Sequence, residues 1–169
     1  MLWAAGEAFP REAPLQLDTG QYDSPRPVRY VVGCCILLNC AALEQVGLFD
    51  EAYFMMHEEK DWCTRAVRAG FQNWYIPAAT AWHDLEHTFT SQGSPRYHYL
   101  YVRNNLYYWQ KGTTDVKGWQ RLRQSLAYVW QEIIFIRHHG KQPVLSARAA
   151  GRGALDFLAG RLGPPPQGL

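Results

Sequence analysis

Residues 58–70 read EEKDWCTRAVRAG and predict the best-defined helix of the chain. Three carboxylates, Glu58, Glu59 and Asp61, stand in its first turn, where the helix dipole favours negative charge. Two arginines lie near its end, and Gly70 follows as a residue that readily ends a helix. Apolar side chains recur at positions i, i+4 and i+7, so we expect one face of this helix to be buried.

The segments around this helix predict an α/β fold, with a short mixed sheet and flanking helices, followed by C-terminal amphipathic helices. Residues 28–38, VRYVVGCCILL, are rich in β-branched and apolar side chains and predict a buried strand. Within it, Cys34 and Cys35 are expected to be buried, reduced thiols. Asn39 is a good N-cap, and Gly47 a good stop, for a short helix between them. The sequence predicts strands at residues 2–5, 28–38, 72–76 and 80–83 and helices at residues 40–46, 95–111, 117–138 and 146–158.

The composition fits one domain, or one large piece of a domain, with a packed core. The chain has 169 residues, of which 47% are hydrophobic and 19% charged, and this excludes wholesale disorder. The formal net charge of +2 argues against a dedicated nucleic-acid binder. Residues 1–110 carry 8 basic against 12 acidic side chains, whereas residues 111–169 carry 9 against 3. This asymmetry predicts a cation site in the first part and an anionic contact in the second.

The acidic turn at residues 58–61 is the strongest candidate for chemistry. Adjacent carboxylates repel each other, so at least one is expected to have a raised pKa, as a general base near neutral pH requires. Glu58 and Asp61 share a helix face, while Glu59 points about 100° away. The alternative interpretation is a solvated acidic turn that only complements the helix dipole.

Histidines and an arginine further along the chain are candidates for binding a metal ion or an anion. His83 and His87 are four residues apart, a zinc-binding spacing on a helix, and with His57 they would suit a small metal hydrolase. This segment follows a predicted strand and lacks the HExxH pattern, so a single histidine ligand at the strand end, or a capping histidine, is the simpler interpretation. Arg103 can pair bidentately with a phosphate or carboxylate, or form a structural ion pair in an aromatic-rich helix.

These groups occur in an order that resembles the inverting glycosyltransferases of family 2, in particular their rhamnosyltransferase-like members. The match covers roughly residues 1–111, and several linked motifs make it more specific than any one of them. The motifs are WAAG at 3–6, GCCILL at 33–38, LEQVGLFDE at 43–51, FMMHEEKDWCTR at 54–65, AGF at 69–71, YIP at 75–77, WH at 82–83 and RN at 103–104.

The resemblance implies a GT-A fold, an α/β sandwich whose first half binds the sugar nucleotide through a DxD motif and a divalent metal, Mg²⁺ or Mn²⁺. The second half of such enzymes binds the acceptor and supplies the catalytic base. No DxD sequence occurs in this chain, so it resembles the second half alone. We therefore expect a partial GT-A-like fold and a fragment that is inactive by itself.

The resemblance also implies roles for individual residues. The acidic motif of the family falls on Glu58, Glu59 and Asp61. Glu59 takes the position of the base that deprotonates the acceptor hydroxyl. The family's late histidine, a metal ligand in some members, falls on His83, and Arg103 matches a position that faces the diphosphate or the acidic motif.

The expected organisation has three parts: an acceptor-side half at residues 1–111, a basic helical tail at 112–163 and a disordered end at 164–169. Over residues 117–160, apolar side chains recur at helical spacing beside arginines. This pattern fits an anionic membrane surface or, equally, a helix packed onto a missing half. Because no signal peptide or membrane-spanning window is recognised, we expect a cytoplasmic protein, peripheral on the inner face of the cell membrane.

Two functions from different classes follow. The leading hypothesis is transfer of a hexosyl or rhamnosyl group, with inversion, from a nucleotide-sugar donor to a hydroxyl of a cell-envelope glycan or lipid-linked acceptor. The alternative is a non-catalytic membrane-peripheral or interaction module derived from such an enzyme. A nucleic-acid partner is not expected.

Overall fold

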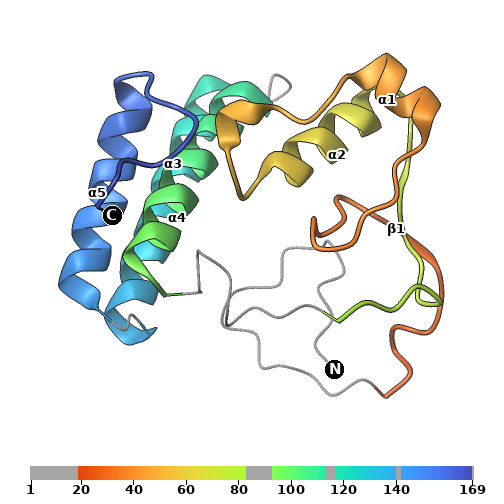
Figure 1. The fold of residues 1–169 in the computed structure, drawn as a ribbon, viewed down its shortest axis with the longest axis horizontal. Helices are drawn as coiled ribbons and strands as arrows, with labels where there is room; N and C mark the ends of the chain where they lie inside the picture. Colours follow the sequence, from red (N-terminus) through yellow and green to blue (C-terminus); the bar gives the residue numbers. More distant parts are fainter. Residues whose placement is uncertain (1–18, 83–92, 113–116, 140–141, 169) are drawn as a thin grey trace. The chain divides into compact units, whose positions relative to one another are not determined.

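The computed structural model describes residues 19–82, 93–112, 117–139 and 142–168. The described chain is mixed α/β and mostly helical, with a small antiparallel sheet (Figure 1). By packing, the chain divides into two units, one of residues 1–49 and 59–83 and the other of residues 50–58 and 84–169. The elements in chain order are β1 (Arg26–Val28), α1 (Cys40–Val46), the 3₁₀ helix η1 (Glu51–Tyr53), α2 (Glu58–Arg68), β2 (Asn73–Tyr75), α3 (Pro95–Gly112), α4 (Gly118–His139) and α5 (Pro143–Leu158).

The sheet described in the first unit is one antiparallel pair, β1 with β2. Val28 lies opposite Asn73 in this pair, and the Asn73 amide also donates to Cys63 O at 3.2 Å, which fastens the sheet to α2. β2 confirms the strand predicted at residues 72–76, with shorter bounds. Residues 80–82 form no strand, and the strand predicted at residues 2–5 lies outside the described residues.

The strand predicted over residues 28–38 is wrong beyond its first residue. β1 ends at Val28, and turns and bends follow. Cys34 and Cys35 are free thiols, but they are exposed rather than buried, and Leu37 is 98% exposed. A strand needs a partner for its backbone groups, and the neighbour described here, β2, is only three residues long. The apolar composition of this run therefore does not produce an extended strand.

α1 and α2 supply the helical core of the first unit. Asn39 Oδ1 accepts from Ala41 N at 2.8 Å and caps α1, and Gly47, at φ 84°, ends it, as predicted. The indole of Trp62 donates to Gly47 O at 2.7 Å and so ties α2 to the end of α1. The buried core comprises Ala42, Trp62, Cys63 and Ala66.

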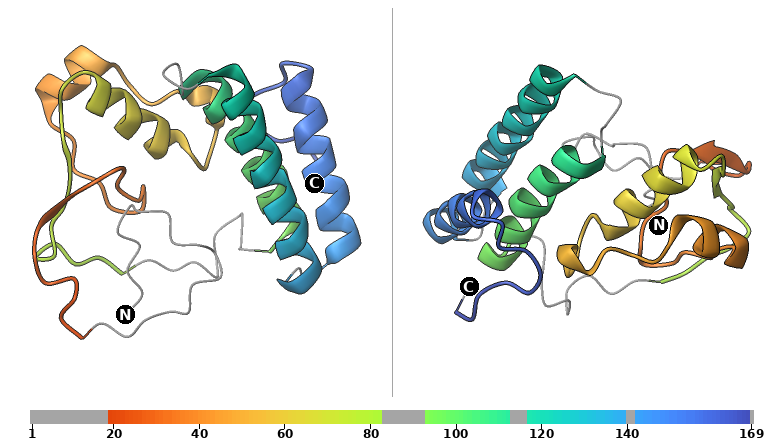
Figure 2. Two further views of the ribbon diagram at one scale, coloured as in Figure 1. Left: turned by 180° about the vertical axis from the view of Figure 1, so that it is seen from behind. Right: turned by 90° about the horizontal axis from the view of Figure 1, so that it is seen from above.

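Three long helices make up most of the second unit, and both views in Figure 2 show them together. α3 and α4 match the predicted helices to within one residue at each end, and α5 begins three residues earlier than predicted. Pro143 explains the earlier start, because proline is well suited to the first helical position. Two buried clusters join the helices: Tyr99, Leu100 and Ala149, and Val102, Ile136 and Ala150.

The helices also share polar contacts in their buried interfaces. His98 Nδ1 of α3 lies 2.5 Å from Glu132 Oε1 of α4. The Tyr99 hydroxyl of α3 donates to Asp156 Oδ2 of α5 at 3.0 Å, and Arg152 also binds this carboxylate. The charged groups between these helices are therefore held by partners, as buried polar groups require.

The segment after α5 also belongs to the described structure. Residues 164–168, expected from sequence to be disordered, are described, and Pro165 and Pro166 are half-buried. Just before them, Gly163 N donates to Ala52 O of η1 at 2.8 Å. Among the described residues, no helix combines the length and apolarity needed to cross a membrane.

Candidate functional site

The loop between η1 and α2 has an unusual backbone. Phe54, Met56 and His57 have φ values of 65°, 73° and 75°, in the left-handed region that residues with a side chain rarely adopt. Such conformations cost about 1–3 kcal/mol each and persist only where the surroundings enforce them. The loop leads directly into Glu58, the first residue of α2, so its conformation sets how the acidic turn begins.

Asn104 of α3 is the main anchor of this loop. Its side-chain amide donates to the carbonyl oxygens of Tyr53 at 2.9 Å, Met55 at 2.7 Å and Met56 at 2.9 Å. The side chain is fully buried. The two N–H groups of one buried amide are thus shared among three carbonyl groups, and this links the left-handed loop to α3.

Arg103, beside Asn104, is a second anchor and is also fully buried. Its guanidinium donates to Tyr53 O at 3.0 Å and to Gly163 O at 2.7 Å, and its Nε donates to Asn104 Oδ1 at 3.0 Å. The side chain thus connects η1, the segment that follows α5 and the neighbouring amide. Its role towards a diphosphate, implied by resemblance, stays a prediction.

His57, the last residue of the loop, also contacts α3. Its Nε2 lies 3.3 Å from Asn105 Nδ2, and its ring packs edge-on against Tyr101, with 5.4 Å between ring centroids. The ring is buried among aromatic side chains of α3. These contacts give His57 a packing role within its own unit.

Glu58 carries the feature most typical of a functional carboxylate. Its Oε2 is buried and has no hydrogen-bond partner among the described residues. Burial raises the pKa of this carboxyl group above its usual value. A buried carboxylate oxygen without a partner is unfavourable for folding, so it is evidence for a group kept for chemistry or binding. The sequence predicts a raised pKa in this turn from repulsion between neighbouring carboxylates, whereas the raised pKa of Glu58 has burial as its cause.

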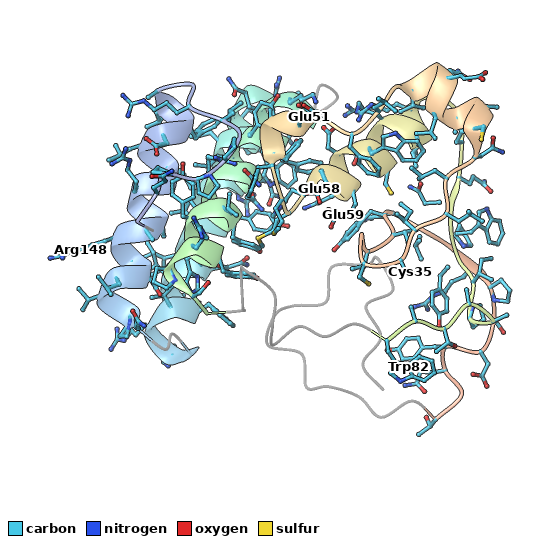
Figure 3. All side chains as sticks on the ribbon, in the orientation of Figure 1. Cys35, Glu51, Glu58, Glu59, Trp82 and Arg148 are labelled. Atoms are coloured by element: carbon cyan, nitrogen blue, oxygen red, sulfur yellow. The ribbon has the colours of Figure 1, made fainter. Side chains whose placement is uncertain are left out.

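Glu59 follows Glu58 on α2, and Figure 3 shows both at the start of this helix. A Cβ added to Gly33 would lie 3.5 Å from Glu59 Cβ and Cγ, so the side chain runs beside the Gly33 backbone. The next residue, Lys60, is largely buried, and this burial lowers its pKa to about 8 although Glu59 opposes the shift. The turn therefore places a lysine with a lowered pKa next to the carboxylate of Glu59.

Asp61 differs from the other two carboxylates because it is buried and paired. It is 1% exposed, and its Oδ2 accepts from Arg65 Nε at 2.8 Å. Arg65 in turn donates to Val46 O at 2.7 Å and Leu48 O at 2.8 Å, at the end of α1. The contacts of Asp61 are those of a residue that orients an arginine within the core of the first unit, and its catalytic role stays a prediction.

The described residues supply only part of the ligand set that the expected divalent metal would need. Glu58 offers a hard carboxylate oxygen with no partner, the type of ligand that Mg²⁺ and Mn²⁺ prefer. No group of three or more His, Cys, Asp or Glu side chains in the described part of the chain could hold a metal ion. His83 and His87 lie outside the described residues, so the ligand role of His83 stays a prediction.

The anchoring amide is the functional feature that sequence reasoning misses. The sequence singles out Arg103 because its guanidinium can pair with anions. The three hydrogen bonds to the loop carbonyl groups, however, are made by its neighbour Asn104. A signal does exist, because two consecutive asparagines are poor formers of a helix interior and α3 contains them in its middle. Buried asparagines in such a position indicate that their side chains bind backbone elsewhere.

Comparisons with known proteins give partial matches. The chain is 42% identical over 65 residues to N-acetylglucosaminyl-diphospho-decaprenol L-rhamnosyltransferase of Mycobacterium tuberculosis, covering 38% of this chain and 21% of that protein. It is 29% identical over 87 residues to the low-salt glycan biosynthesis hexosyltransferase Agl10 of Haloferax volcanii, covering 52% of this chain and 28% of that one. No family profile and no solved structure matches. The chain is thus similar to two glycosyltransferases over part of its length and spans about a quarter of each.

Proposed function

We propose that this chain is the acceptor-side, base-bearing portion of an inverting family 2 glycosyltransferase with a GT-A-like fold. The observation that carries the proposal is the Glu58–Glu59 pair at the start of α2, in which Glu58 has a buried oxygen without a partner among the described residues. The similarity to a rhamnosyltransferase and a hexosyltransferase supports the reaction class. The substrates would be a nucleotide-sugar donor and a glycan or lipid-linked acceptor of the cell envelope.

Glu59 is the proposed catalytic base. Its carboxylate takes the proton of the acceptor hydroxyl as that oxygen attacks the anomeric carbon of the donor. The new C–O bond forms on one face while the bond to the nucleoside diphosphate breaks on the other, and the bonding electrons leave with the diphosphate. This in-line displacement inverts the anomeric configuration.

Glu58 and Glu59 would have different roles in the reaction because their environments differ. Burial raises the pKa of Glu58, so this carboxyl group takes up a proton at a higher pH than an exposed glutamate. The partnerless oxygen of Glu58 can then bind the acceptor while Glu59 acts as the base. Neighbouring carboxyl groups whose environments give them different pKa values are a common arrangement for acid–base chemistry.

The loop of residues 54–57 and its anchors would position Glu58. Asn104 and Arg103 fix the backbone that leads into Glu58, so they act through the loop rather than on the substrate. In the complete enzyme, a divalent metal would neutralise charge on the departing diphosphate, with His83 its predicted ligand in this chain.

A reconstituted enzyme tests the proposal. The missing donor-binding half is supplied by fusion or in trans, and sugar transfer is measured from the nucleotide sugar. Glu59→Gln should lower kcat by about 10²–10⁴-fold, because the base is lost, while Glu59→Asp retains part of the activity. Glu44→Gln, which removes an exposed carboxylate on α1, is the matched control and should be neutral. Full turnover by the Glu59→Gln enzyme would show that the base assignment is wrong.

A non-catalytic module derived from such an enzyme is the second candidate. The observation that favours it is the exposed apolar side chains of α4. This candidate predicts that the reconstituted protein neither binds a nucleotide sugar nor transfers its sugar. Saturable binding of the nucleotide sugar with measurable transfer would exclude it.

A further inference from the structure

The outward side of α4 carries a continuous line of apolar side chains. Their spacing of three or four residues places them on one face of the helix, and each is between 46% and 64% exposed. Figure 2 shows α4 as an outer helix of its unit in the view from behind. The members of this apolar line are Trp119, Leu122, Leu126, Trp130 and Ile133.

Among the described residues, the exposed charges beside this line and near its ends are all basic. Lys117, Arg123 and Arg137 are exposed beside or beyond its ends. The single carboxylate of α4, Glu132, is 1% exposed and lies against His98 in the helical interior. The outer face of α4 is therefore apolar and cationic, with no exposed acidic group to oppose an anionic partner.

The same segregation occurs on the two neighbouring helices. α5 has one carboxylate, Asp156, which is buried and bonded to Tyr99 and Arg152. Its Arg148 projects outward, as Figure 3 shows. α3 contains no acidic residue. Soluble surfaces normally mix both signs of charge, so a three-helix surface that exposes only cations is built for an anionic contact.

We propose that the outer face of α4 docks onto the surface of an anionic lipid bilayer. Tryptophans favour the headgroup region, aliphatic side chains enter the acyl boundary, and flanking arginines reach lipid phosphates. The helix has 22 residues and would lie in the plane of the interface over about 33 Å. This docking is independent of sugar transfer and needs neither a donor nor an acceptor.

Vesicle co-sedimentation tests the proposal with the chain as it is. Vesicles of phosphatidylcholine in which about a third of the lipid is phosphatidylglycerol should bind the protein, and binding should weaken with added salt. Pure phosphatidylcholine should bind much less. The double variant Leu126→Ala/Trp130→Ala should weaken binding at least about tenfold, because two inserted side chains are lost.

Matched controls distinguish binding through this face from nonspecific binding through other exposed residues. Leu37→Ala/Trp82→Ala removes the same two residue types, which are 98% and 85% exposed outside α4, and should leave binding unchanged. Arg123→Glu should weaken binding about tenfold or more, whereas Arg29→Glu, at another exposed arginine, should have little effect.

Three results would overturn the proposal. The wild-type chain could fail to bind anionic vesicles, or the two double variants could weaken binding equally. The α4 variants could also leave vesicle binding intact while lowering the molar mass of the protein measured by light scattering. In that last case a second copy of the chain, and not a bilayer, covers the face. Because the vesicles carry no sugar or polyprenol, none of these outcomes bears on the proposed transferase activity.

Discussion

Asn104 Nδ2 lies 2.7 Å from the carbonyl oxygen of Met55, and this bond links the middle of α3 to the loop that precedes the acidic turn. The same amide reaches the carbonyl groups of Tyr53 and Met56. One side chain thus compensates for the unfavourable backbone of a whole loop. The placement of Glu58, which begins the next helix, depends on this anchor.

Asn104→Ala should lower the free energy of unfolding by about 2–4 kcal/mol, because three bonds are lost and their carbonyl groups stay buried. Asn104→Asp keeps the size but replaces the donor with an acceptor, so it should be at least as destabilising. Urea denaturation measures both. The control Gln124→Ala, at an exposed position of α4, should change stability by less than about 0.5 kcal/mol. Native stability in the Asp variant would refute the donor role.

Phe54 offers a direct test of the left-handed backbone. At φ 65° and ψ −54°, glycine is tolerated better than alanine, so Phe54→Gly should be more stable than Phe54→Ala by about 1 kcal/mol. At Gln131, an exposed helical position of α4, the order should reverse by about the same amount. Denaturant midpoints of the four variants provide the measurement. The same order at both positions would mean that Phe54 does not adopt this conformation in solution.

Two glycines of α5 should respond oppositely to alanine. A Cβ at Gly153 would lie 2.4 Å from Tyr99 O, whereas nothing lies within 4 Å of a Cβ at Gly151. Gly153→Ala should therefore destabilise the chain by about 2 kcal/mol or more, because the helices must separate. Gly151→Ala should stabilise it by about 0.5–1 kcal/mol through helix propensity. Thermal unfolding distinguishes the two, and equal effects would contradict the close packing of α3 on α5.

Glu58→Gln should raise stability and lower activity. The pKa of Glu58 is raised in the folded state, so the folded carboxylate is penalised as the pH rises above its ordinary value of 4.5. At neutral pH, the glutamine variant should gain up to about 1 kcal/mol, and this gain should vanish below that value. Transfer by the reconstituted enzyme should fall.

Glu51→Gln, at an exposed glutamate labelled in Figure 3, is the control for the Glu58 variant and should change neither property. Chemical denaturation at several pH values, together with the transfer assay, gives both readouts. A Glu58→Gln protein that is less stable at neutral pH would show that the carboxylate makes favourable contacts.

Lys60 should produce a stability change at alkaline pH. Its pKa falls from 10.5 to about 8 on folding, mainly because the ammonium group is buried. Below about pH 8 the charged lysine penalises folding, and stability recovers as the pH rises from about 8 towards 10.5. Lys60→Met should therefore gain about 1–3 kcal/mol at pH 7. The stability difference between wild type and variant, followed by urea denaturation against pH, should shrink through this interval. A constant difference would contradict the shifted pKa.

Local signals explain which parts of the fold were predictable. α1 and α2 carry their own boundaries, since Asn39 caps one helix and glycines at positive φ follow both. The residues from 29 to 38 contain no comparable signal for where a strand should end. The β-branched residues among them describe a preference for extended backbone, but the length of a strand depends on a distant partner. The exposed positions of Cys34 and Cys35 follow from that missing partner.

The candidate site was predictable only in its charged half. The acidic residues of α2 are visible in the sequence because their spacing and position at a helix start can be recognised. The loop before them is not, because left-handed backbone is normally indicated by glycine or asparagine, and here it falls on phenylalanine, methionine and histidine. Tertiary contacts, among them those of Asn104 and Arg103, hold that backbone in place.

The two hydrogen bonds at Gly163 have a consequence for biosynthesis. Its amide binds Ala52 and its carbonyl binds Arg103, so three segments that lie far apart in the sequence complete one small structure. A ribosome must translate through Gly163 before these two bonds can form. A chain that stops before residue 163 would carry every acidic residue of the turn that begins α2 and still lack these two hydrogen bonds.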